Sequence, residues 1–159
     1  MDLSEAKSRI AEALVESIFR RARYDVAAFK TDQALLRFGR EDFSPLFRVS
    51  QRVDGEDRSY LIAVKYRPSA EQFISVENQR GERAIFQMMR RHWPTLYFVL
   101  VTERPEAGRS CFQVVPFETM RPGESRTVDL LQVKELQLYP HNLEDHEELT
   151  RRIFGSLNA

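Results

Sequence analysis

Cysteine is almost absent from this chain of 159 residues, because Cys111 is its single cysteine. One cysteine cannot form an internal disulfide, and the strand-like segment around Cys111 predicts that its side chain is a small member of the core. Long apolar runs are absent too: the longest, residues 96–101, is far shorter than the roughly 20 residues of a membrane-spanning helix. Because the sequence also opens without a signal-peptide pattern, we expect a cytoplasmic protein without membrane contact.

Glycine and histidine are too scattered for two common kinds of site. The six glycines stand singly, which excludes a glycine-rich phosphate-binding loop. Three histidines and one cysteine exclude a Cys/His metal cluster. We therefore expect His92, His141 and His146 to be ordinary surface residues.

Net charge is lacking as well, since 24 lysines and arginines balance 24 aspartates and glutamates. Such a protein has no overall field that attracts nucleic acid from a distance, although a local basic face is compatible with the balance. Its residues are 42% hydrophobic and 11% aromatic, enough to form a core, and its length is that of one domain. We therefore expect a single soluble domain over residues 1–159.

The spacing of apolar residues predicts an order of helices and strands. A helix is expected over residues 4–22, with Asp2 or Ser4 as its N-cap, followed by an extended stretch from Tyr24. The later predicted elements are strands at 34–38, 46–53 and 60–66, a helix that follows the break at Pro68 and Ser69 and is best defined at 76–92, strands at 95–102 and 110–117, and a helix at 143–157 capped by Asn142. Residues 120–139 show no clear period and have no assignment.

This order predicts an α/β fold with a mixed central β-sheet flanked by helices on both faces. Strands 46–53 and 60–66 are joined by a turn at 54–57 and form an antiparallel hairpin. The helix that follows is a crossover connection, which makes the strands on either side of it parallel. Strand 60–66 is apolar on both faces until Lys65, which is typical of a central strand.

Short motifs follow one another in this framework. Glu12 lies in the first helix, Pro45-Leu46 opens a strand, and Ala63-Val64-Lys65 ends the partner strand of the hairpin. With these motifs the chain resembles the PD-(D/E)XK, or restriction-endonuclease-like, nuclease superfamily over about residues 5–118. The resemblance implies a restriction-endonuclease-like core, with residues 119–159 as an extension that carries an added C-terminal helix.

The chain departs from this family at the metal ligands. In the family, an aspartate and a second acid on adjacent strands bind a divalent metal ion that activates water, while the lysine orients the water or stabilises charge. Here Leu46 and Ala63 stand at the two acid positions, and their side chains offer no oxygen to a metal. The resemblance therefore implies a degenerate site without metal or cofactor, in which Glu12 and Lys65 remain and lie with Ala63 around one concavity.

We expect such a domain to be non-catalytic and to act as a nucleic-acid-associated or protein-interaction module. Its candidate partners are DNA, RNA, a protein or a second copy of the chain. Arg67, Arg80 and Arg83 are the candidate phosphate contacts, although charged residues around a helix more often form a solvated face. A purely structural domain without nucleic-acid contact is compatible with the zero net charge.

The alternative is a divergent nuclease that cleaves phosphodiester bonds of DNA or RNA with Mg²⁺ as its cofactor. It requires a carboxylate in place of the lost aspartate, and Asp42, a few residues before Leu46, is the candidate. Glu12, Asp42 and Lys65 would then be the catalytic residues.

Overall fold

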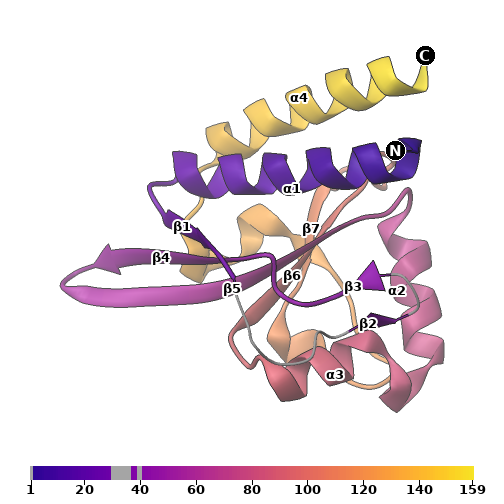
Figure 1. Ribbon diagram of the computed structural model, residues 1–159, viewed down its shortest axis with the longest axis horizontal. Helices are drawn as coiled ribbons and strands as arrows, with labels where there is room; N and C mark the ends of the chain where they lie inside the picture. The colour runs from indigo at the N-terminus through magenta and orange to yellow at the C-terminus, as the bar shows by residue number, and fades with distance from the viewer. Residues whose placement is uncertain (1, 30–36, 39–40) are drawn as a thin grey trace.

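The computed structural model describes residues 2–29, 37–38 and 41–159, which form a mixed α/β fold (Figure 1). Its main feature is a six-stranded sheet in the order β1-β4-β5-β6-β7-β8. Its strands are β1 (Asp25–Ala28), β4 (Phe47–Val53), β5 (Glu56–Tyr66), β6 (Leu96–Val101), β7 (Phe112–Val115) and β8 (Val128–Asp129). β5 and β6 are parallel and the other neighbours are antiparallel, which confirms the predicted mixed sheet.

Helices cover both faces of this sheet, as predicted. On one face α1 (Leu3–Arg21) and α4 (Pro140–Asn158) lie side by side, and on the other face pack α2 (Ala70–Gln79) and α3 (Ile85–His92) (Figure 1). None of the described helices is long and apolar enough to cross a membrane.

β5 separates two apolar cores. Ile62 and Val64 belong to the cluster under α1 and α4, whereas Leu61 and Ala63 belong to the cluster under α2 and α3. The division follows from the alternation of side chains along a strand. Lys65 continues the second series, so its side chain leaves the sheet on the side of α2 and α3.

α1 confirms the predicted first helix. Its N-cap is Asp2, whose side chain accepts a hydrogen bond from the backbone N–H of Glu5 at 2.8 Å. Leu14, Ile18 and Phe19 are buried against the sheet, and each buried side chain of this size contributes about 1.5–3 kcal/mol.

The β4–β5 hairpin turns at Asp54 and Gly55. Both have positive φ angles, 52° and 80°, and an aspartate-glycine pair is favoured in two-residue hairpin turns because such turns need this conformation. β5 begins at Glu56, earlier than predicted, because pairing starts directly after the turn. The hairpin therefore extends beyond the body of the sheet (Figure 1).

The prediction of one helix over residues 76–92 is wrong. The chain forms α2 and α3, separated by a 3-10 turn at Gly81–Arg83. Gly81 adopts a positive φ of 58°, which ends the regular helix. The carboxylate of Glu77 then accepts a hydrogen bond from the backbone N–H of Ile85 at 2.8 Å, so a side chain of α2 caps the first turn of α3.

The predicted start of the last helix is also wrong. α4 begins at Pro140, a residue that suits the first helical position, rather than after Asn142. The side chain of Asn142 is buried and donates a hydrogen bond to the Ile18 carbonyl of α1 at 2.9 Å. His146, which we expected at the surface, is buried as well, and its ring contacts Ser17 of α1 at 2.8 Å.

Residues 120–139, which had no assignment, form β8 and two 3-10 turns, Leu130–Gln132 and Lys134–Leu136. Leu130, Val133 and Leu136 are buried in the core under α1 and α4. Of the predicted strand at 34–38, residues 34–36 lie outside the described residues. Arg37–Phe38 form β2, which pairs with β3 (Glu41–Asp42) in a separate sheet.

Candidate functional site

Glu12 lies half-buried on α1 and lines a hollow of about 310 Å³ together with Leu46. Burial raises the pKa of the Glu12 carboxyl, while the positive charges of Lys65 and Arg9 act against this rise. Lys65 is therefore close enough to Glu12 for its positive charge to affect the pKa of the Glu12 carboxyl. The described lining of this hollow comes from α1, β1, Leu46 and the start of β4, and neither Lys65 nor Ala63 is part of it.

Lys65 approaches from the other side of the sheet. Its ammonium group lies 5.0 Å from the centroid of the Phe43 ring, a distance at which a cation is attracted to an aromatic face. Ala63, two residues earlier on the same face, is 1% exposed and belongs to the core under α2 and α3. Glu12 and Lys65 thus act on each other from opposite faces of the sheet.

Leu46 and Ala63, the positions at which the resemblance implies lost acids, lie close to each other, with Leu46 directly before β4 and Ala63 on β5. The backbone N–H of Leu46 donates to the carbonyl of Ile62, the residue before Ala63, at 2.7 Å. Asp42 is engaged by its own turn, because its carboxylate accepts a hydrogen bond from the backbone N–H of Ser44 at 2.9 Å. Over the described ranges, no group of three or more metal-ligating side chains is found.

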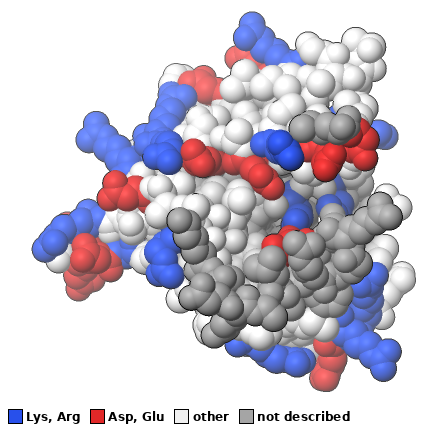
Figure 2. Space-filling view, in the orientation of Figure 1, with Lys and Arg blue, Asp and Glu red and all other residues white. Residues whose placement is uncertain are grey.

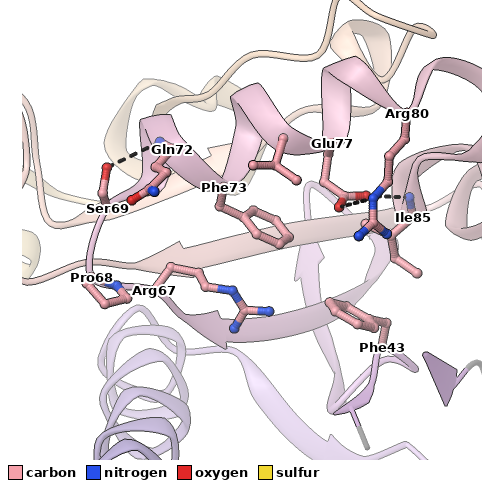
Figure 3. Close-up of a pocket in the computed structure, with 10 residues that line it drawn as sticks. Phe43, Arg67, Pro68, Ser69, Gln72, Phe73, Glu77, Arg80 and Ile85 are labelled. Carbon is pink, nitrogen blue, oxygen red and sulfur yellow. Dashed lines mark hydrogen bonds and ion pairs between the residues drawn. The ribbon is translucent and has the colours of Figure 1, made fainter. Parts of the chain in front are cut away.

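A larger cavity of about 630 Å³ lies beside α2 (Figure 3), and we call it the arginine cavity. It is lined by Phe43, Arg67, Pro68, Ser69, Gln72, Phe73, Val76, Glu77, Arg80 and Ile85. Arg67 follows the end of β5, and its guanidinium lies 4.7 Å from the centroid of the Phe73 ring. Phe43 lines the cavity and contacts Lys65, so the arginine cavity adjoins the site of the predicted lysine.

The charges of this cavity are partly balanced. The side chain of Arg80 lies 3.6 Å from the Glu77 carboxylate, which is buried. Ser69 caps α2 by accepting a hydrogen bond from the backbone N–H of Gln72 at 3.2 Å, and the cavity extends along α2 from this N-cap to Arg80 at its C-terminal end. Among the described residues of the lining, two are arginines and one is a glutamate.

The structure brings Arg67 and Arg80 together but places Arg83 elsewhere, exposed on the 3-10 turn and outside this lining. Sequence reasoning missed Ser69, Gln72 and Phe73. Their signal was present, because residues 69, 72, 73, 76, 77 and 80 follow the spacing of one helical face.

Comparison with known proteins finds no matching family model, no matching curated protein and no matching solved structure. On the visible face of the molecule, side chains of both charge signs are interspersed and do not gather in one large patch (Figure 2). A function must therefore be argued from the local geometry of the hollow at Glu12 and of the arginine cavity.

Proposed function

We propose that this chain is a restriction-endonuclease-like domain that no longer hydrolyses its target and binds nucleic acid through the arginine cavity. The observation that carries the proposal is the convergence of Arg67 and Arg80, from two different elements, on one open cavity. Guanidinium groups present forked donors that match phosphate oxygens.

The hollow at Glu12 supports the non-catalytic half of the proposal. Metal-assisted cleavage needs carboxylate oxygens next to the scissile phosphate. Leu46, beside Glu12, offers none, and Ala63 is buried among apolar residues. Lys65 lies next to the arginine cavity through its contact with Phe43, and in our proposal its charge adds to the attraction of phosphate.

Binding is tested by fluorescence anisotropy with labelled single-stranded and double-stranded DNA and RNA, without divalent metal, between about 50 and 200 mM salt. We expect Arg67→Gln/Arg80→Gln to weaken binding about tenfold and to reduce the salt slope by about two, because two phosphate contacts are lost. Arg83→Gln is the matched control and should bind like the wild type. Thermal melts verify that each variant is folded.

Cleavage is tested on the same nucleic acids with Mn²⁺, with Lys65→Ala alongside the wild type. We expect intact substrate with both proteins. Metal-dependent cleavage that disappears in Lys65→Ala would replace our proposal by the nuclease alternative with Asp42 and Glu12. Absence of binding to every nucleic acid would contradict the proposal and favour a protein-interaction module.

A further inference from the structure

A third cavity, of about 600 Å³, lies where the beginning of α1 and the end of α4 meet the ends of β5 and β6. Both chain termini lie at this end of the molecule (Figure 1). We call this cavity the terminal pocket; its lining includes Lys7, Tyr66, Cys111, Arg151 and Phe154. Its volume is within the range of pockets that enclose a small organic molecule.

One wall of the terminal pocket is a closed network of polar groups. Lys7 forms an ion pair with Glu103, and the two side chains are only 8% and 9% exposed. The Lys7 ammonium also donates to the side-chain oxygen of Asn158 at 2.6 Å and lies 5.7 Å and 5.9 Å from the ring centroids of Tyr66 and Phe154. Lys7 thus occupies the place that a cationic ligand would take between aromatic rings and a carboxylate.

The rim of the terminal pocket has an excess of positive charge. Arg104 and Arg151 line it and are exposed, and neither forms an ion pair within the part of the chain that the structure describes. The other charged groups of the lining are held by neighbours, and Glu147 is the carboxylate among them that no described cation pairs with. Arg109 pairs with Asp129, and Glu147 accepts a hydrogen bond from Ser110.

Both rim arginines lie close enough to the floor of the pocket for their charges to act on its titratable groups. Burial raises the pKa of the Tyr66 hydroxyl, and the charge of Arg104 acts against this rise. Burial and the negative charge of Glu147 raise the pKa of the Cys111 thiol to about 12, and the charge of Arg151 acts against this rise. The floor itself includes two members of the apolar core, Cys111 and Phe154, which are 6% and 2% exposed.

We propose that the terminal pocket binds a small organic anion, whose acidic group is held by Arg104 and Arg151 and whose apolar part lies against Phe154 and Cys111. The charge-assisted hydrogen bonds that arginine makes to an oxyanion supply the specificity. The apolar floor supplies the burial that a small ligand needs. This inference is independent of the nucleic-acid proposal, because neither Arg67 nor Arg80 lines the terminal pocket.

The test uses two fluorescent probes of similar shape, the anion 8-anilinonaphthalene-1-sulfonate and the uncharged N-phenyl-1-naphthylamine. We expect one sulfonate probe to bind per chain, about tenfold more tightly than the neutral one, because charged hydrogen bonds are added. Arg104→Gln/Arg151→Gln should remove this preference and leave the affinity for the neutral probe almost unchanged. Arg152→Gln is the matched control, since Arg152 pairs with Glu148 on the same helix and does not line the pocket.

A blocking variant locates the probe. A Cβ atom at Gly155, which also lines the pocket, would meet no atom within 4 Å. Gly155→Phe is therefore expected to fill the cavity in a folded protein and to exclude both probes. Displacement of the sulfonate by octanoate or by 1-naphthyl phosphate supports the proposal and tells which acidic group is preferred.

The proposal is overturned if the wild type binds the two probes with equal affinity, or if the double arginine variant binds the sulfonate as tightly as the wild type. It is also overturned if Arg152→Gln loses as much sulfonate affinity as the double variant, or if folded Gly155→Phe still binds the sulfonate. Failure of both octanoate and 1-naphthyl phosphate to displace the probe would also contradict it.

Discussion

Lys7 and Glu103 illustrate what a single buried pair of charges does in this protein. Removal of both groups from water is costly, and their mutual attraction roughly offsets that cost. The arrangement is supported by further bonds, since Glu103 also interacts with Tyr66 and Asn158. The pair therefore contributes to a defined geometry of the terminal pocket more than to the free energy of unfolding.

Removal of only one charge of the Lys7–Glu103 pair lowers the free energy of unfolding much more than removal of both charges. We expect Lys7→Met to lower the free energy of unfolding by about 3 kcal/mol, because Glu103 is left buried without its cation. Lys7→Met/Glu103→Gln should recover part of this loss, since no buried charge remains. Urea unfolding at pH 7 measures both, with Lys134→Met as an exposed control. A Lys7→Met protein as stable as this control would contradict the account of a buried pair.

At the scale of elements, α1 and α4 are joined by a polar network in an otherwise apolar interface. His146 Nδ1 lies 2.7 Å from the Asn142 carbonyl, which can only accept, so Nδ1 carries the proton. His146 Nε2 then accepts the hydroxyl of Ser17 at 2.8 Å. Asn142 in turn donates to the Ile18 carbonyl, and this bond fixes α4 against α1.

This network predicts opposite results for two histidines of the same helix. His146→Ala removes a buried ring and two hydrogen bonds, and we expect a loss of about 2–4 kcal/mol in the free energy of unfolding. His141→Ala alters an exposed residue in the first turn of α4 and should change the free energy of unfolding by less than about 0.5 kcal/mol. Chemical denaturation at neutral pH distinguishes them. Equal effects would show that the His146 contacts do not stabilise the packing of α1 on α4.

Sequence reasoning succeeded where an element is specified by its own residues. The stripe of α1 and the turn at Asp54 and Gly55 are local signals, and both were predicted. It failed where a distant partner decides: the side chain of Asn142 bonds to α1 instead of capping α4, and that of Glu77 caps a helix after Gly81.

Residues 120–139, which had no assignment, show a different limit of prediction from the sequence. Leu130, Val133 and Leu136 are three residues apart, which is the repeat of a 3-10 helix, and they lie in and between two 3-10 turns that are too short to give a periodic signal. At the candidate site, the sequence indicated Arg67 and Arg80 as charges. Their position in one cavity depends on where α2 begins after β5 and where it ends, whereas the helix predicted after Pro68 and Ser69 continued to residue 92.

At the scale of the whole molecule, carboxylates connect parts of the chain that are distant in sequence. Glu103 joins the end of β6 to α1 through Lys7. Asp129 accepts from the side chain of Gln113 at 2.6 Å, from the Ser110 N–H at 3.1 Å and from Arg109 at 3.1 Å, and so joins β8 to β7. These bonds are made to the ionised form of each carboxylate.

Their pKa values follow from this placement. Burial alone would raise the pKa of Glu103, but hydrogen bonds from Lys7, Tyr66 and Asn158 hold it below its ordinary value. Burial is likewise outweighed at Asp129, whose pKa is lowered by Gln113, Ser110 and Arg109. A carboxylate with a lowered pKa in the folded state stabilises the protein above its unfolded pKa, and this stability is lost as the pH falls through the folded value.

We therefore expect the free energy of unfolding to change little from pH 7 to about 5 and to fall below about pH 4, where the unfolded chain takes up protons first. Asp129→Asn should be less stable than the wild type at pH 7 and should lose less stability between pH 5 and 3, because one linked group is gone. Glu56→Gln, at an exposed position in the hairpin, serves as the control. Urea unfolding across this pH range is the measurement. The raised pKa of Glu12 acts with the opposite sign, because it makes the folded protein more stable as the pH falls. A wild type that gains stability on acidification would therefore show that Glu12 has a larger effect on the free energy of unfolding than Glu103 and Asp129 together.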